Sequence, residues 1–143
     1  MKLRDELLPN ASEERISKVL SKIKEIETHL NNTNKVSKLI DKLNEFSYRD
    51  YNKEYFQNFR KYEKIEDLAR DIAQIPPKKT NITDDELTEV INRIRNNDIN
   101  SHFYYQIIDV NINYGAASEI IDFPENQGLK NSEDIAHFIK YFR

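Results

Sequence analysis

The sequence predicts an all-α protein, a helical bundle built from two degenerate four-helix pseudo-repeats. Charged residues make up 33% of the 143 residues and hydrophobic residues 38%, a balance that suits amphipathic helices. Glycine occurs only twice and proline four times, which is little for the turns of a sheet protein. Most hydrophobic residues recur at spacings of three and four, the period of one face of an α-helix.

Four helical segments with this spacing are predicted before the Pro76-Pro77 pair: residues 12–32, 36–46, 50–62 and 65–75. Ser12 stands at the N-cap position of the first segment, and the two prolines end the fourth because proline cannot continue a helix. The third segment is aromatic rather than aliphatic. Bases stand between its rings, as in nucleic-acid stacking platforms, but the rings have helical core spacing and acids interrupt the positive charge. Core packing is the favoured role.

Four more segments follow the linker: residues 83–95, 101–114, 117–123 and a last one with Ser132 as its N-cap. Thr83 and Glu86 have the spacing of a capping box. Residues 101–114 are rich in β-branched and aromatic residues, so a strand is an alternative there. Helical neighbours, and Gly115 in the position of a residue that terminates a helix, favour a helix. The predicted core comprises Ile16, Leu20, Ile23, Leu39, Leu43, Phe56, Leu68, Ile72, Leu87, Val90, Ile94, Ile107, Ile121, Ile135 and Ile139.

The two halves of the chain resemble each other in sequence. SEERISKVLSKIK at 12–24 matches TDDELTEVINRIR at 83–95, and EDLARDI at 66–72 matches EDIAHFI at 133–139. The matches keep their order and a nearly constant spacing, which favours a tandem repeat of a four-helix unit. We therefore divide the sequence into a first repeat and a second repeat within one packed body, comprising residues 1–80 and 81–143.

Charge differs between these halves. Residues 1–80 hold 17 basic and 14 acidic residues, whereas residues 81–143 hold 5 basic and 11 acidic residues. An acidic surface repels nucleic acid, so we predict no direct nucleic-acid binding. The same surface attracts a protein partner with a basic surface. An ordinary solvated face is the alternative explanation.

Residue types that carry chemistry are scarce. The chain has no cysteine, which excludes disulfides, thiolate catalysis and cysteine-based metal sites. Its two glycines cannot form a phosphate-binding loop, and its three histidines lack metal-ligand spacing. We predict no catalytic residue, no metal site, no cofactor and no enzyme activity. The charged start and the lack of a long apolar run predict a cytoplasmic protein that does not contact the membrane.

One motif in the second half has a counterpart in a known family. Ser118-Glu119-Ile120-Ile121-Asp122-Phe123-Pro124, within a match that covers about residues 84–143, resembles the third-helix signature of the colicin and pyocin nuclease immunity proteins. The resemblance implies a distorted four-helix bundle that binds a nuclease toxin beside its active site. It departs from the family in that Glu119 replaces an aspartate, Asp122 replaces the first aromatic residue, and this chain has two units where the family has one.

The family's binding surface implies which residues would contact a partner here. Glu119 and Phe123 carry over directly, and Asp122 takes the place of an aromatic anchor. Tyr105 and Asp109 are one turn apart, so they share a face if residues 101–114 are helical.

Two functions remain open at the level of sequence. The first is an immunity protein that neutralises a cognate antibacterial toxin, by resemblance a nuclease, through occlusion of its basic active-site region. The second is a helical adaptor or scaffold with no toxin partner, in which the repeat forms a binding groove. The sequence does not indicate the toxin's identity, the oligomeric state, or whether the first half also binds a partner.

Overall fold

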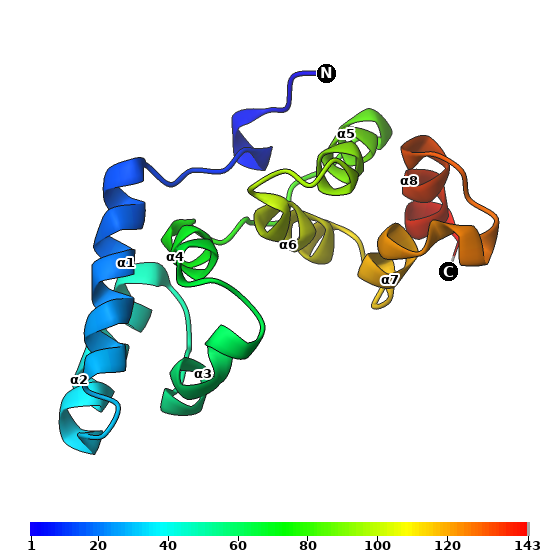
Figure 1. Cartoon of the computed structure of the whole chain (residues 1–143). Helices are drawn as coiled ribbons and strands as arrows, with labels where there is room; N and C mark the ends of the chain where they lie inside the picture. The colour runs from blue at the N-terminus through cyan, green and yellow to red at the C-terminus, as the bar shows by residue number, and fades with distance from the viewer. Residues whose placement is uncertain (143) are drawn as a thin grey trace. The chain divides into compact units, whose positions relative to one another are not determined.

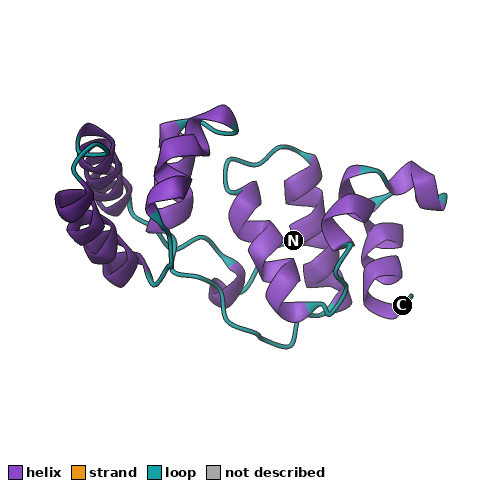
Figure 2. Cartoon of the chain, turned by 90° about the horizontal axis from the view of Figure 1, so that it is seen from below, coloured by secondary structure: helices purple, strands orange, loops and turns teal. Residues whose placement is uncertain are grey.

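The computed structural model describes residues 1–142 and contains only helices and loops in that range (Figure 2). Eight α-helices are present there, which confirms the all-α prediction, including a helix in the ambiguous region after residue 101. Their bounds are α1 Glu13–Thr28, α2 Thr33–Ser47, α3 Lys53–Asn58, α4 Ile65–Ala73, α5 Asp84–Arg95, α6 Ser101–Asn111, α7 Ala117–Asp122 and α8 Ser132–Tyr141 (Figure 1). Three 3-10 helices, η1 Asp5–Leu7, η2 Phe59–Lys61 and η3 Pro124–Gln127, complete the described chain.

The chain divides into two compact units, each with its own hydrophobic core. We call Asn10–Ile75 the N-unit, and Met1–Pro9 together with the residues from Pro76 onward the C-unit. Apart from η1 in the C-unit, both units have the same order: two longer helices, a short α-helix followed by a 3-10 helix, and a final helix. In each unit the final helix packs most extensively on the first, α4 on α1 and α8 on α5. The first and final helices of each unit are also the segments whose sequences match between the two halves, α1 with α5 and α4 with α8.

The N-unit follows its sequence pattern closely. Ser12 caps α1 by accepting a hydrogen bond from the amide of Arg15, and the Asn32 side chain caps α2 in the same way. The aromatic segment does not form one helix over residues 50–62 as predicted. Its α-helix, α3, ends at Asn58, and the chain continues as the 3-10 helix η2. Its Phe56 and Phe59 are buried, as core packing requires.

Two predicted core residues of the N-unit are only half-buried. Leu20 and Leu39 pack against the core from its edge, whereas their neighbours Val19 and Ile40 are buried. Ile16, Ile23 and Leu43 are buried as predicted, so Leu20 and Leu39 lie at the edge of each apolar stripe and not at its centre.

The C-unit shows how local signals set helix ends. Thr83 and Glu86 form the predicted capping box at the start of α5. Gly115 does not terminate α6, because the helix ends at Asn111 and only Gly128 among the glycines has a left-handed backbone, with φ of +71°. Ser132 is the first residue of α8 rather than its cap, since the Asn131 side chain accepts the amide hydrogen bond of Asp134.

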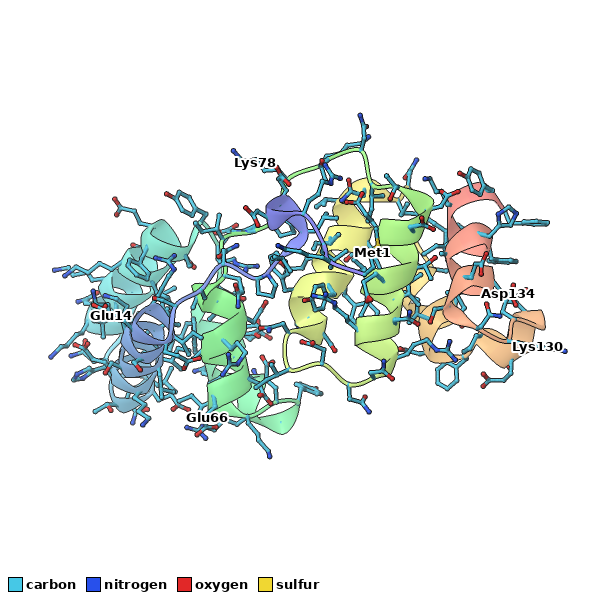
Figure 3. The ribbon with its side chains drawn as sticks, turned by 90° about the horizontal axis from the view of Figure 1, so that it is seen from above. Met1, Glu14, Glu66, Lys78, Lys130 and Asp134 are labelled. Atoms are coloured by element: carbon cyan, nitrogen blue, oxygen red, sulfur yellow. The ribbon has the colours of Figure 1, made fainter. Side chains whose placement is uncertain are left out.

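The first nine residues belong to the C-unit core, although sequence alone groups them with residues 10–80. Leu3 and Leu7 are buried in the same cluster as Leu87. Arg4 donates two hydrogen bonds to the Glu86 carboxylate, from Nε at 2.6 Å and from a terminal nitrogen at 3.0 Å. In Figure 3, Met1 lies against α5, and its amino group is 3.7 Å from Glu89.

We expect the stability of the C-unit to fall in acid partly through Glu86. The Arg4 hydrogen bond, followed by the Thr83 amide, holds the pKa of this buried carboxyl below its ordinary value of 4.5. A lowered native pKa stabilises the fold above the unfolded pKa, and this stabilisation is lost as the pH falls through the native pKa. Chemical denaturation should therefore show a smaller loss between about pH 5 and pH 3 for Glu86→Gln than for wild type. The exposed Glu133→Gln is the control, and an equal loss in all three proteins would contradict the prediction.

Candidate protein-binding surface

The short helix α7 presents its charged residues outward because its apolar residues face the core. Ile120 and Ile121 are buried, whereas Glu119 and Asp122 are exposed. Pro124 starts the following 3-10 helix, where its missing N–H is not needed. The chain then turns at Gly128 and leads into α8. The sequence motif therefore has the predicted form of a short helix closed by a proline.

Helix α6 lies beside α7 in the C-unit and supplies Tyr105. Its buried face consists of aromatic and branched residues: Phe103, Tyr104, Ile107 and Ile108. Tyr105 is half-buried and Asp109 is exposed one turn later, which places them on the shared face that the sequence predicts for a helix.

Tyr105 and Asp122 are joined directly. The Tyr105 hydroxyl donates a hydrogen bond of 2.5 Å to Oδ1 of Asp122. Burial raises the pKa of the Tyr105 hydroxyl, and the hydrogen bond and negative charge of Asp122 raise it further. The pair therefore fixes the aromatic ring against the end of α7, so that little side-chain freedom is lost if a partner contacts the ring.

This pair lines a cleft of about 450 Å³ in the C-unit. The cleft also contains Ile121 and Pro124 from the predicted motif. Its other lining residues come from the end of α5, the α5–α6 turn, the start of α6 and η3: Ile94, Arg95, Asn97, Ser101 and Glu125. The sequence pattern does not predict that these residues share a surface. The sequence does contain the Asn96-Asn97 pair, which is typical of a turn, and in the structure Asn97 has a left-handed backbone with φ of 57°.

The remaining predicted residues lie outside this cleft. The Phe123 side chain is 53% exposed and directly follows Asp122. Glu119 and Asp109 are also exposed, on α7 and α6 respectively. The structure thus joins Tyr105 and Asp122 by a hydrogen bond. The other three predicted residues are separate exposed groups: Asp109 on α6, Glu119 on α7, and Phe123 directly after α7.

Neither a metal site nor a membrane span is present within the described residues. No group of three or more histidine, cysteine, aspartate or glutamate side chains in residues 1–142 is arranged to hold a metal ion. No helix in that range has the length and apolar character needed to cross a bilayer. Comparison of the chain with protein-family models, curated proteins and solved structures finds no match.

Proposed function

We propose that the protein is an immunity protein that binds a cognate antibacterial toxin, a nuclease, and occludes the toxin's basic active-site region. The observation that carries the proposal is the fixed Tyr105–Asp122 pair together with the exposed Phe123, which directly follows Asp122 in the chain. An exposed aromatic residue beside a preorganised polar contact is typical of the few residues that dominate affinity in protein interfaces. The resemblance of residues 118–124 to the immunity family supports the same surface.

The charge of the C-unit supports a basic partner. The C-unit contains 13 acidic and 9 basic residues, whereas the N-unit contains 12 acidic and 13 basic residues. A nuclease binds the phosphate backbone through basic residues, and carboxylates compete for that surface. Asp109 and Glu119 would act as exposed charges that speed association, while Phe123 would slow release.

Inhibition of this kind needs no chemistry from the inhibitor. The toxin would lose activity because its nucleic-acid site is covered and its positive charge is neutralised. Tyr105 would contribute its ring and not its proton, since the hydroxyl is already bonded to Asp122. The role of each residue is therefore to bind and orient.

The test is co-expression of the chain with the product of the neighbouring gene, followed by purification of the complex and a nuclease protection assay. With a toxin in hand, Asp109→Lys and Glu119→Lys should each lower the association rate about tenfold at low salt and reduce its salt dependence. Asp41→Lys on α2 of the N-unit changes the net charge equally and is the control, with an expected change of less than about twofold. Absence of any toxin partner would remove the immunity role in favour of a helical adaptor.

If a toxin binds and both reversals behave like the Asp41 control, the α6–α7 surface is not the interface. Immunity would then have to operate through another face of the chain. These two negative results differ in what they contradict. Absence of a toxin partner contradicts the immunity function, whereas unchanged binding by the charge-reversal variants contradicts only the location of the interface.

A further inference from the structure

The N-unit contains a basic cleft that the proposed toxin surface does not use. It lies between α1 and α2, which run beside each other (Figure 1), and has a volume of about 570 Å³. Three cationic side chains line it, from Arg15, Lys22 and Lys42, with Glu45 as the one carboxylate in the lining. The cleft therefore has an excess of positive charge.

Two of the three cationic groups lie over one aromatic ring. The guanidinium carbon of Arg15 is 4.2 Å from the centroid of the Phe46 ring, and the Lys22 ammonium is 5.5 Å from the same centroid. Arg15 is held by hydrogen bonds to the carbonyls of Ala73 at 2.6 Å and Phe46 at 3.0 Å. These two bonds leave further N–H donors of the guanidinium for a ligand. Neither Lys22 nor Lys42 forms an ion pair with any described residue.

Two exposed apolar side chains complete the cleft. Tyr48 is 73% exposed and Ile75 is 48% exposed. Tyr48 is also the C-cap of α2 and has a left-handed backbone, with φ of 57° and ψ of 38°. Glycine or asparagine adopts this conformation more readily than a residue with a bulky side chain. The backbone strain at Tyr48 is therefore not offset by burial of its ring within the N-unit.

We propose that this cleft binds an acidic segment of a partner protein. Carboxylates of the segment would lie among Arg15, Lys22 and Lys42, and an adjacent apolar residue would pack on Tyr48 and Ile75. A free phosphate would match the cations but leave both apolar side chains uncovered. Nucleic acid needs an extended basic surface, and the N-unit, with 13 basic and 12 acidic residues, has positive charge concentrated only locally. The proposal is independent of the toxin.

The first test measures binding of a short fluorescein-labelled peptide in which glutamates flank a central Leu-Trp pair. Anisotropy should saturate with this peptide but not with the version carrying glutamine at every glutamate. The double variant Lys22→Glu with Lys42→Glu should weaken binding at least about tenfold. Lys35→Glu with Lys38→Glu reverses two exposed lysines of α2 that do not line the cleft, and should change affinity less than about twofold.

Three results would overturn the proposal: no saturable binding of the acidic peptide, equal losses in the two double variants, or tighter binding of oligothymidylate than of the peptide. The last result would identify the cleft as a nucleic-acid site. Nitrogen-15 NMR spectra of the full chain with the peptide should place the largest shift changes in α1 and α2, which separates the cleft from any contact with the C-unit.

Tyr48→Asn separates binding from folding. Asparagine tolerates the left-handed backbone, so the melting temperature should stay level or rise. Loss of the Tyr48 ring should nevertheless lower the affinity for the acidic peptide at least about fivefold. Unchanged peptide affinity in a stable Tyr48→Asn protein would rule out the apolar half of the proposed contact.

Discussion

Leu7→Ala should lower the free energy of unfolding of the C-unit by about 2 to 5 kcal/mol. Leu7 is 1% exposed and packs in the same core as Leu87, so its truncation leaves a cavity in the C-unit core. The size of the loss depends on how far the neighbouring side chains can collapse into that cavity. Chemical denaturation followed by circular dichroism measures the free energy.

Leu8→Ala is the matched control, because Leu8 is the same residue type at the next position and is only half-buried. Its loss should be about 1 kcal/mol or less. Hydrogen exchange should locate the effect of Leu7→Ala, with faster exchange in α5 and α8 before any change in α1 and α4. Faster exchange confined to α1 and α4 would show that the first nine residues stabilise the N-unit, as their place in the sequence suggests.

The attachment of the amino-terminal segment could not be predicted from sequence. Only one turn of 3-10 helix forms there, and Leu3 and Leu7 supply just two apolar residues at helical spacing. Such a short pattern does not specify which core it joins. Tertiary contacts fix the segment: Leu3 and Leu7 are buried in the C-unit core, and Arg4 pairs with Glu86, which in sequence is already explained by the capping box.

The helices themselves were largely predictable because their ends are set by local chemistry. The capping box at Thr83 and the proline pair after α4 depend on a few adjacent residues, and the structure contains both features. Positions at the edge of an apolar stripe were less predictable. Leu20 and Leu39 fit the helical period, yet the orientation of each helix toward its neighbours decides which residues become fully buried.

The candidate surface was predictable only where local helical spacing determines it. The α6 helix puts Tyr105 and Asp109 on one face, as spacing alone indicates. The hydrogen bond between Tyr105 and Asp122 depends on how α6 packs beside α7, so sequence could place both residues at the surface but not join them. Arg95 and Ser101 line the cleft only because the α5–α6 turn folds back beside α7.

If the proposed toxin complex forms, Phe123→Ala should weaken it by about 2 kcal/mol or more, which corresponds to roughly a thirtyfold rise in Kd. The Phe123 side chain is already 53% exposed, so its removal should cost the free protein little stability. A loss of affinity would then arise from the contact itself. The expected change is mainly a faster dissociation rate, because an apolar anchor contributes little to electrostatic steering.

Phe142→Ala is the matched control for this prediction. Phe142 is an exposed phenylalanine of the same unit, 62% accessible, whose ring stacks on Phe138 at a centroid distance of 5.4 Å. It lines a different cleft, beside α8, so its truncation should change the Kd less than about threefold. Surface plasmon resonance with the purified toxin gives both rate constants. A larger loss for Phe142→Ala than for Phe123→Ala would move the toxin interface from α7 to α8, because affinity depends on the ring that the partner covers and not on exposure alone.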